Sequence, residues 1–288
     1  MNKPLFVSLA VLCSLGSMFG CRASHAETPA LNPMPDGSRD MYVGLGVQSA
    51  PRYDGAGVRR VRALPVLQVE WSNGLFVSGM NAGWHLSSSP TLEYGPLLGL
   101  VAKRDGGGDG NGVGGVGTFA RLPEFSALKR SPQGLDGIDE IGARLQAGAF
   151  LNVYLDPQWR LSASLLYGSG RERDGARLTL DVQRLAAAIG ERHRVSLAAG
   201  VTAVNRNDNA SYFGVSDEEA LRSRFEQYAP GGGLQDAHLD ARWNWTWSPS
   251  WMMTTDLRAK RLLGSAAHSP LVERSSNLTV STAIAYRF

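Results

Sequence analysis

The chain has 288 residues, and its 34 glycines and 14 prolines exclude a mainly helical protein, because glycine inside a helix costs about 1 kcal/mol relative to alanine. Its 29 Lys and Arg residues against 26 Asp and Glu residues give a net charge of +3, too small for a surface dedicated to nucleic acid. No long linker divides the chain after residue 40, so the sequence indicates one domain.

The N-terminal segment has the features of a secretory signal peptide. Lys3 gives a basic start, an apolar run extends from Leu5 to Phe19, and Ser24-His25-Ala26 resembles a cleavage site. The run is shorter than the ~20 residues that a membrane-spanning helix needs. An alternative is lipid attachment at Cys21. Either process predicts that the chain leaves the cytoplasm.

This interpretation divides the chain into three parts. We expect a signal peptide at residues 1–26, a periplasmic tail at residues 27–40 and an outer-membrane barrel at residues 41–288. Both cysteines, Cys13 and Cys21, lie in the signal peptide, so the mature chain is expected to have neither disulfides nor thiol chemistry.

The mature chain contains long segments in which apolar and polar residues alternate. They include 141–155, 237–247 and 278–288, each longer than the usual five or six residues of a soluble strand. The alternation predicts strands with one face toward lipid and the other toward a lumen. Only a closed barrel satisfies every backbone group of such strands in a membrane. The predicted fold class is therefore all-β, a single antiparallel transmembrane barrel.

The pattern predicts about twelve strands with both ends in the periplasm. Their expected ranges are 41–50, 62–71, 74–82, 92–103, 112–121, 140–155, 158–168, 175–188, 193–205, 236–247, 250–262 and 276–288. Short periplasmic turns are then expected at 72–74, 156–158, 190–192 and 248–250, and a longer one at 104–111. Trp159, Trp247 and Trp251 flank two of these turns, as expected for an aromatic girdle.

The loops offer few groups for chemistry. The glycine-rich run Gly106 to Gly117 lacks a following Lys-Ser/Thr pair and is interpreted as a flexible turn, not a phosphate loop. His268 and Ser269, with Glu273 nearby, leave a lipid hydrolase as an alternative, although adjacent loop residues do not establish a catalytic pair. The histidines have no metal-ligand spacing. We predict no catalytic, cofactor-binding or metal-binding residue, and no cofactor.

Loop 206–235 contains a helix signal. Ser216 and Glu219 form a capping box, and Ala220, Leu221 and Phe225 give a short apolar stripe. A helix of about two turns from Asp217 is expected. It could fold over the mouth or into the lumen, or be a solvated helix without function.

The inward strand faces are expected to be highly charged. These residues are Arg144, Arg160, Arg177, Asp181, His238, Asp240, Arg242, Asp256, Arg258, Lys260 and Arg287. A water-filled channel and an ion-paired plug would each explain them, and a barrel of this size leaves both open.

Four segments carry a resemblance to a known family. They are Gly44–Val47 with Ala50–Gly55, Tyr212–Ser216, Arg261–Ala267 with Ser269–Val272, and Ala285–Phe288. In these segments the sequence resembles the MipA/OmpV outer-membrane proteins, also called MltA-interacting proteins. Ser265 stands where the family usually has an acidic residue.

The resemblance implies an outer-membrane barrel without catalytic residues. It also implies a scaffold that joins a periplasmic murein transglycosylase to a murein synthase. Other members act in adhesion and in stress or antibiotic responses. We therefore expect a non-enzymatic scaffold or adaptor for cell-envelope machinery; the alternatives are a small-solute channel, a surface adhesin and a barrel lipid hydrolase.

The expected partners follow from both lines of reasoning. They are outer-membrane lipid, the barrel-insertion machinery acting on Phe288, and the two murein enzymes, with no nucleic acid. Periplasmic binding is expected to use the tail 27–40 and the turn 104–111, because the other turns are short.

Overall fold

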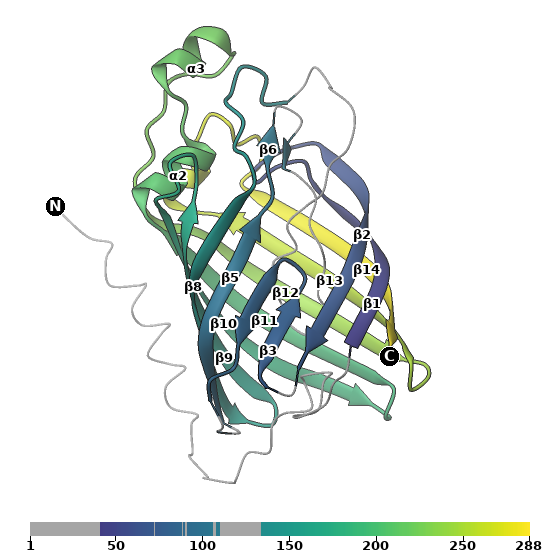
Figure 1. The fold of residues 1–288 in the computed structure, drawn as a ribbon. Coiled ribbons are helices and arrows are strands. Elements are labelled where there is room, and N and C mark those ends of the chain that lie inside the picture. Colours follow the sequence, from purple (N-terminus) through teal and green to yellow (C-terminus); the bar gives the residue numbers. More distant parts are fainter. Residues whose placement is uncertain (1–40, 72, 88, 90, 106–107, 110–133) are drawn as a thin grey trace, which may run out of the picture.

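The computed structural model describes residues 41–288 apart from positions 72, 88, 90, 106–107 and 110–133. Twelve of its strands form a closed antiparallel barrel (Figure 1). They are β1 (Met41–Pro51), β2 (Arg59–Glu70), β3 (Leu75–Ser78), β4 (Asn81–Trp84), β5 (Leu92–Val101), β8 (Arg144–Asp156), β9 (Trp159–Ser169), β10 (Gly175–Ile189), β11 (His193–Val204), β12 (Gly233–Thr246), β13 (Trp251–Leu262) and β14 (Ser276–Arg287). The barrel closes where β1 pairs with β14, from Tyr42↔Arg287 to Ser49↔Val280.

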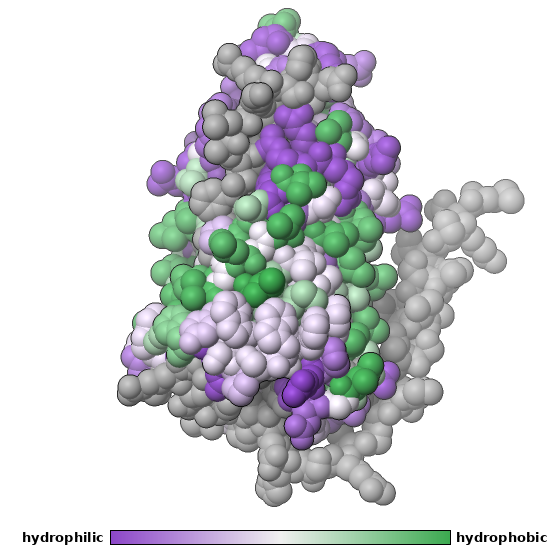
Figure 2. All heavy atoms as spheres, turned by 90° about the vertical axis from the view of Figure 1, so that its right-hand side faces the viewer, coloured by the Kyte–Doolittle hydropathy of each residue, from purple (hydrophilic) through white to green (hydrophobic). Residues whose placement is uncertain are grey.

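The predicted alternation of faces is confirmed. Leu45 on β1 and Leu239 on β12 are exposed on the outside, whereas Gln48 and Asp240 on the same strands are buried. Since successive side chains of a strand point to opposite faces, the apolar residues form an outer surface and the polar ones line the lumen. Figure 2 shows hydrophobic residues gathered around the middle of the barrel and hydrophilic residues toward the loops.

Aromatic rings form a row on the outside, at the end of the barrel that holds Met41 and Phe288, here called the turn end. The row runs from Trp243 and Trp245, whose centroids are 6.1 Å apart, through Trp247 and Trp251 to Tyr286. The expected girdle residues Trp247 and Trp251 are stacked with centroids 6.5 Å apart. Their position fits the interface between membrane and water.

The barrel has twelve strands, as predicted, but two of the predicted strand ranges differ from the structure. The expected strand 74–82 is a hairpin of two short strands, β3 and β4, that reverses at Gly79, where φ is +60°. A backbone with positive φ favours glycine, so a tight reversal is possible there. The expected strand 112–121 lies outside the described residues, and β5 pairs directly with β8.

This extra hairpin reverses the expected direction of β5. The segment 104–111 was expected as a periplasmic turn, and that prediction is wrong. Its described part forms the small hairpin β6 (Arg104–Asp105) and β7 (Gly108–Asp109), near α2 and α3 at the opposite, loop end of the barrel (Figure 1). The connection 85–91 lies at the turn end instead, where the backbone N–H of His85 donates to Gly74 O at 2.8 Å.

The described residues include three short helices at the loop end: α2 (Arg206–Phe213), α3 (Asp217–Arg222) and α4 (Gly264–Ala267). The helix expected at Asp217 is confirmed, with both halves of the Ser216/Glu219 capping box present. It spans six residues, which is close to the two turns expected. No helix in the described ranges is long and apolar enough to cross a membrane.

Candidate lumen site

Ion pairs cover one wall of the lumen. On β12 and β13, Arg242 Nε lies 2.6 Å from Asp256 Oδ1, and Arg258 binds Asp240 through both Nε and its terminal nitrogen, the latter at 3.2 Å. These pairs follow the register, because Asp240 lies opposite Arg258 and Arg242 opposite Asp256. Period two places alternate residues of both strands on the inner face, so opposite charges meet across the ladder.

His238 lies between two carboxylates on the same wall. Its Nε2 is 2.7 Å from Asp181 Oδ1, and its Nδ1 is 3.0 Å from Asp236 Oδ1. Ionised carboxylates only accept hydrogen bonds, so both ring nitrogens donate and the geometry fits an imidazolium. Gly200 on β11 allows this approach, since a Cβ there would clash with Asp181 and His238.

Helix α2 packs at the loop end of the lumen, against β9, β10 and β12. Its first turn begins at Asn205, whose side chain accepts from the backbone N–H of Asp208 at 2.9 Å. The Asp208 carboxylate is fully buried and accepts from Ser169 Oγ at 2.6 Å and from Arg177 at 3.1 Å. Gln235 donates to the same carboxylate at 3.1 Å. These contacts hold the helix to β9, β10 and β12.

Two further contacts tie the loop end to the wall. Lys260 binds Asp54 from the connection between β1 and β2. Arg104 donates to the carbonyl oxygen of Tyr212 at 2.7 Å. The lid over the lumen is therefore built from three separate connections.

The other half of the lumen is filled by side chains. Tyr42, Val66, Met252, Ala283 and Ala285 form a buried apolar cluster on the inner faces of β1, β2, β13 and β14. On the opposite side, Tyr154 donates to Glu93 at 2.7 Å, and Arg160 binds Gln183. Packed side chains of this kind occupy the lumen toward the turn end.

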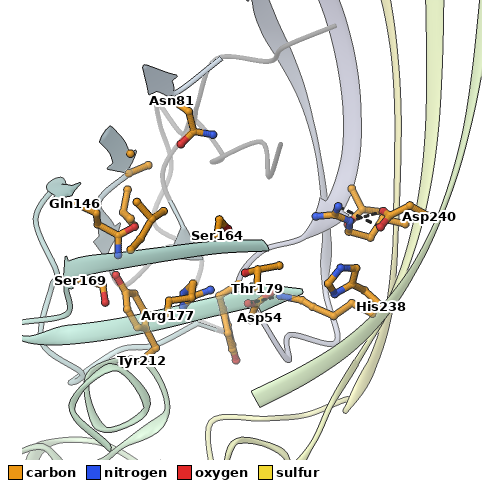
Figure 3. A pocket seen from close by; sticks show the side chains of 18 of the residues that line it. Asp54, Asn81, Gln146, Ser164, Ser169, Arg177, Thr179, Tyr212, His238 and Asp240 are labelled. Carbon is orange, nitrogen blue, oxygen red and sulfur yellow. Dashed lines mark hydrogen bonds and ion pairs between the residues drawn. The ribbon is translucent and has the colours of Figure 1, made fainter. Parts of the chain in front are cut away.

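Between the lid and this filled region lies a cavity of about 380 Å³. The ion pairs form its charged wall. Its other wall is neutral and comes from β4, β5, β8 and β9, with Asn81, Leu97, Gln146, Ser164 and Leu166 facing the space. Figure 3 shows Gln146 and Ser169 across the cavity from His238 and Asp240.

Most of the predicted lumen residues meet in this cavity. Those that line it are Arg177, Asp181, His238, Asp240, Arg242, Asp256, Arg258 and Lys260. Arg144 lies at the loop end, where Nε donates to Gly170 O at 3.2 Å, and Arg160 lies in the filled half. Arg287 is opposite Tyr42 at the turn end.

The sequence reasoning missed three of the lining residues, Gln48, Asp54 and Tyr212. Gln48 occupies an inward position of an alternating strand, as Gln146 does in the segment 141–155, so the period-two pattern could have revealed it. Asp54 and Tyr212 line the cavity from a loop and from α2. No periodicity marks such positions.

A second cluster lies above the lumen. Tyr53, Leu135, Val215, Phe225 and Leu271 come from four connections and, with Ala56 and Ile138, form a buried apolar cluster, here called the loop core. Burial and the nearby Glu273 carboxylate raise the pKa of Tyr53 to about 12. The loops therefore pack on one another as a small folded unit.

Glu219 of α3 ties this unit together. Its side chain is 0% exposed and accepts from the backbone N–H groups of Ser216 and Asp139, each at 2.8 Å, and from Arg171. Burial alone would raise the pKa of Glu219, but these donors outweigh it and hold the pKa below its usual value.

The residues of the hydrolase alternative have structural contacts. Ser269 is 4% exposed, and its hydroxyl donates to Phe213 O at 2.6 Å. His268 Nδ1 is 2.8 Å from Gly264 O, and a carbonyl only accepts, so Nδ1 donates there. Glu273 accepts from the backbone N–H of Gly57 at 2.9 Å. The described residues contain no cluster of His, Cys, Asp and Glu that could hold a metal ion.

The closed twelve-stranded barrel with an apolar outside and a polar inside defines a transmembrane β-barrel of the outer-membrane type. The family model described as MltA-interacting protein MipA matches residues 43–288. The chain belongs to this family, and the resemblance seen in the sequence is confirmed.

Individual relatives are more distant. The MltA-interacting protein of Escherichia coli (strain K12) is 30% identical over 94 residues, which are 33% of this chain and 38% of that protein. The MltA-interacting protein of Shigella flexneri gives the same values. The alignment thus covers well under half of the length of these relatives.

Solved structures with similarity to the barrel include membrane proteins of other families. A bacterial polysaccharide outer membrane secretin has a TM-score of 0.46 and 10% identity, covering 86% of this chain and 98% of that chain. An outer membrane channel from Pseudomonas putida F1 has a TM-score of 0.41 and 11% identity, covering 94% of this chain and all of that chain.

Proposed function

We propose that this chain is a non-enzymatic adaptor of the outer membrane that holds murein-processing enzymes at the membrane after its signal peptide, residues 1–26, is removed. The observation that carries the proposal is a lumen that is packed toward the turn end and has α2 bound at the loop end. Asp208 fixes α2 over one half, and the apolar cluster around Met252 fills the other. A barrel filled in this way serves as an anchor, and the family is named for an interaction.

A periplasmic enzyme would bind the turn end. The candidate surfaces are the tail 27–40, which lies outside the described residues, and the connection 85–91, where Leu86 is 54% exposed. The segment 104–111 no longer qualifies, because β6 and β7 lie at the loop end.

A binding assay with a matched control tests this proposal. The purified mature chain is immobilised and incubated with a murein transglycosylase and a murein synthase from the same bacterium. We expect both enzymes to be retained, and deletion of residues 28–38 or Leu86→Ser to weaken retention. Leu221→Ser is the control, because Leu221 is 90% exposed on α3 at the opposite end. The adaptor role would be contradicted if the unchanged chain does not retain the enzymes, or if only Leu221→Ser weakens their retention.

A second function is favoured by one observation. The cavity of about 380 Å³ with charged lining residues is also what a gated small-solute channel would contain. Planar-bilayer conductance separates the two functions. The adaptor predicts little conductance from the unchanged barrel, and Asp208→Ala is expected to raise it by loosening α2. Steady conductance from the unchanged barrel would favour the channel.

A further inference from the structure

The lumen cavity has the size of a ligand site. Its volume of about 380 Å³ lies in the range of small-molecule pockets, which runs from about 300 to 1,000 Å³. It is bounded by α2 at one end and by packed side chains at the other, with Phe213 and Tyr53 among the residues near the lid.

The charges around the cavity are already compensated. Arg242 binds Asp256, Arg258 binds Asp240, and Lys260 binds Asp54. A ligand with a strong net charge would have to break such a pair and leave a buried charge without a partner, which is unfavourable.

Two amides lining the cavity have polar atoms without partners. Gln48 on β1 and Gln146 on β8 are each 3% exposed, and β1 and β8 lie far apart around the barrel. Gln48 Oε1 and Gln146 Nε2 have no hydrogen-bond partner among the described residues. The first needs a donor and the second an acceptor, and a molecule with several hydroxyl groups can supply both, since a hydroxyl can donate or accept.

The neutral wall adds an apolar surface beside Gln146. Gly99 on β5 has no side chain, and a Cβ built there would lie 3.2 Å from Asn81 Oδ1 and 3.3 Å from Leu166 Cδ1. Gln146 Oε1 would be 3.8 Å away. Leu97 lines the same wall. An amide next to aliphatic carbon matches the hydroxyl edge and the C–H face of a sugar ring.

From this combination we propose that the lumen cavity binds a small uncharged polyhydroxylated molecule of the saccharide class, with Gln48 and Gln146 as hydrogen-bonding residues. This ligand site is separate from the adaptor surface at the turn end. Either proposal can therefore fail without the other.

A panel of labelled probes tests the ligand class on the unchanged protein. The full mature chain is kept in lauryldimethylamine oxide, a detergent without a sugar headgroup, and is dialysed to equilibrium overnight because α2 covers the loop end. The sugars are glucose, N-acetylglucosamine and cellobiose, and the comparison probes are glutamate, spermidine and decanoate. We expect saturable binding of at least one sugar and weaker binding of the comparison probes. The proposal is overturned if no sugar binds, or if a comparison probe binds more tightly than all of them.

Matched variants test the placement. Gln48→Met and Gln146→Met keep the side-chain volume and remove the amide, so each is expected to weaken binding about fivefold for one lost hydrogen bond. Gln68→Met is the control, because Gln68 is an equally buried glutamine on β2 that does not line the cavity. If all three variants bind the sugar with equal affinity, the placement of the sugar against Gln48 and Gln146 is overturned.

The fold of each variant is checked by its heat-modifiable migration in electrophoresis. If an amide variant does not fold, Thr179→Val replaces it, since Thr179 also lines the cavity and this change removes one hydroxyl. Weaker sugar binding in that variant supports the placement, and unchanged binding counts against it.

Discussion

Replacement of Glu219 by glutamine should loosen the loop core. The carboxylate has two oxygens for three donors, the backbone N–H groups of Ser216 and Asp139 and the guanidinium of Arg171. Glutamine keeps the shape but offers one accepting oxygen and turns an N–H₂ group toward donors. A hydrogen bond to a charged group contributes about 1.5–3 kcal/mol, so the change is expected to cost ~2–3 kcal/mol of local stability.

Trypsin cleavage measures this loss. Trypsin can cleave after Arg222, the last residue of α3, and after Arg224, and cleavage there requires local opening of the loop core. When opening is fast, the cleavage rate follows the population of the open state. At 1.36 kcal/mol per tenfold change, the expected acceleration is about 30- to 160-fold. Mass spectrometry of the released peptides reports the rate.

The control is Glu218→Gln, because Glu218 is the exposed neighbour of Glu219 on α3. It removes the same charge without removing a buried acceptor and should leave cleavage unchanged. Equal cleavage rates for Glu219→Gln, Glu218→Gln and the unchanged chain would refute the role given to Glu219.

Acidic pH should also remove the stabilisation that the Glu219 carboxylate gives the loop core. The folded-state pKa of Glu219 lies below its unfolded value of about 4.3, so its stabilisation is present above that pH and is lost as the pH falls through the folded-state pKa. With an acid-active protease such as pepsin, the difference between the unchanged chain and Glu219→Gln should shrink below pH ~4. A difference that stays constant into strong acid would contradict the assignment.

Three further predictions concern the two faces of β9, the C-terminal Phe288 and Tyr53 of the loop core. Leu165 faces outward, so Leu165→Arg should lower the free energy of unfolding by ~2–4 kcal/mol if the site is near the membrane midplane. Ser164 faces the cavity, so Ser164→Arg should lower it less. Urea unfolding measures both variants. Deletion of Phe288, whose N–H donates to Met41 O at 3.0 Å, should abolish insertion, as seen by loss of heat-modifiable barrel from outer-membrane fractions. The pKa of Tyr53 is raised to about 12 from the usual 10, so its contribution to stability is present below pH ~10 and is lost as the pH rises through 12. Ultraviolet titration of the unchanged chain and of Tyr53→Phe measures this.

The residue pattern alone determined the barrel and the direction of its side chains. Which face of a strand is buried depends on period two, a property of neighbouring residues, and the segments 141–155 and 237–247 carry it over many positions. The capped helix at Asp217 is local in the same sense, since Ser216 and Glu219 are three residues apart.

Only the tertiary structure decided what meets across the lumen. Lys260 binds Asp54 from a loop 206 residues away, and Asp208 reaches Ser169 through a helix that the pattern did not predict. The hairpin at Gly79 likewise sets the direction of β5 and so the end of the barrel where residue 104 lies. Strand number, stagger and loop packing fix these contacts together, and each depends on residues distant in the chain, so the sequence could predict the inward charges but not the cavity that they line.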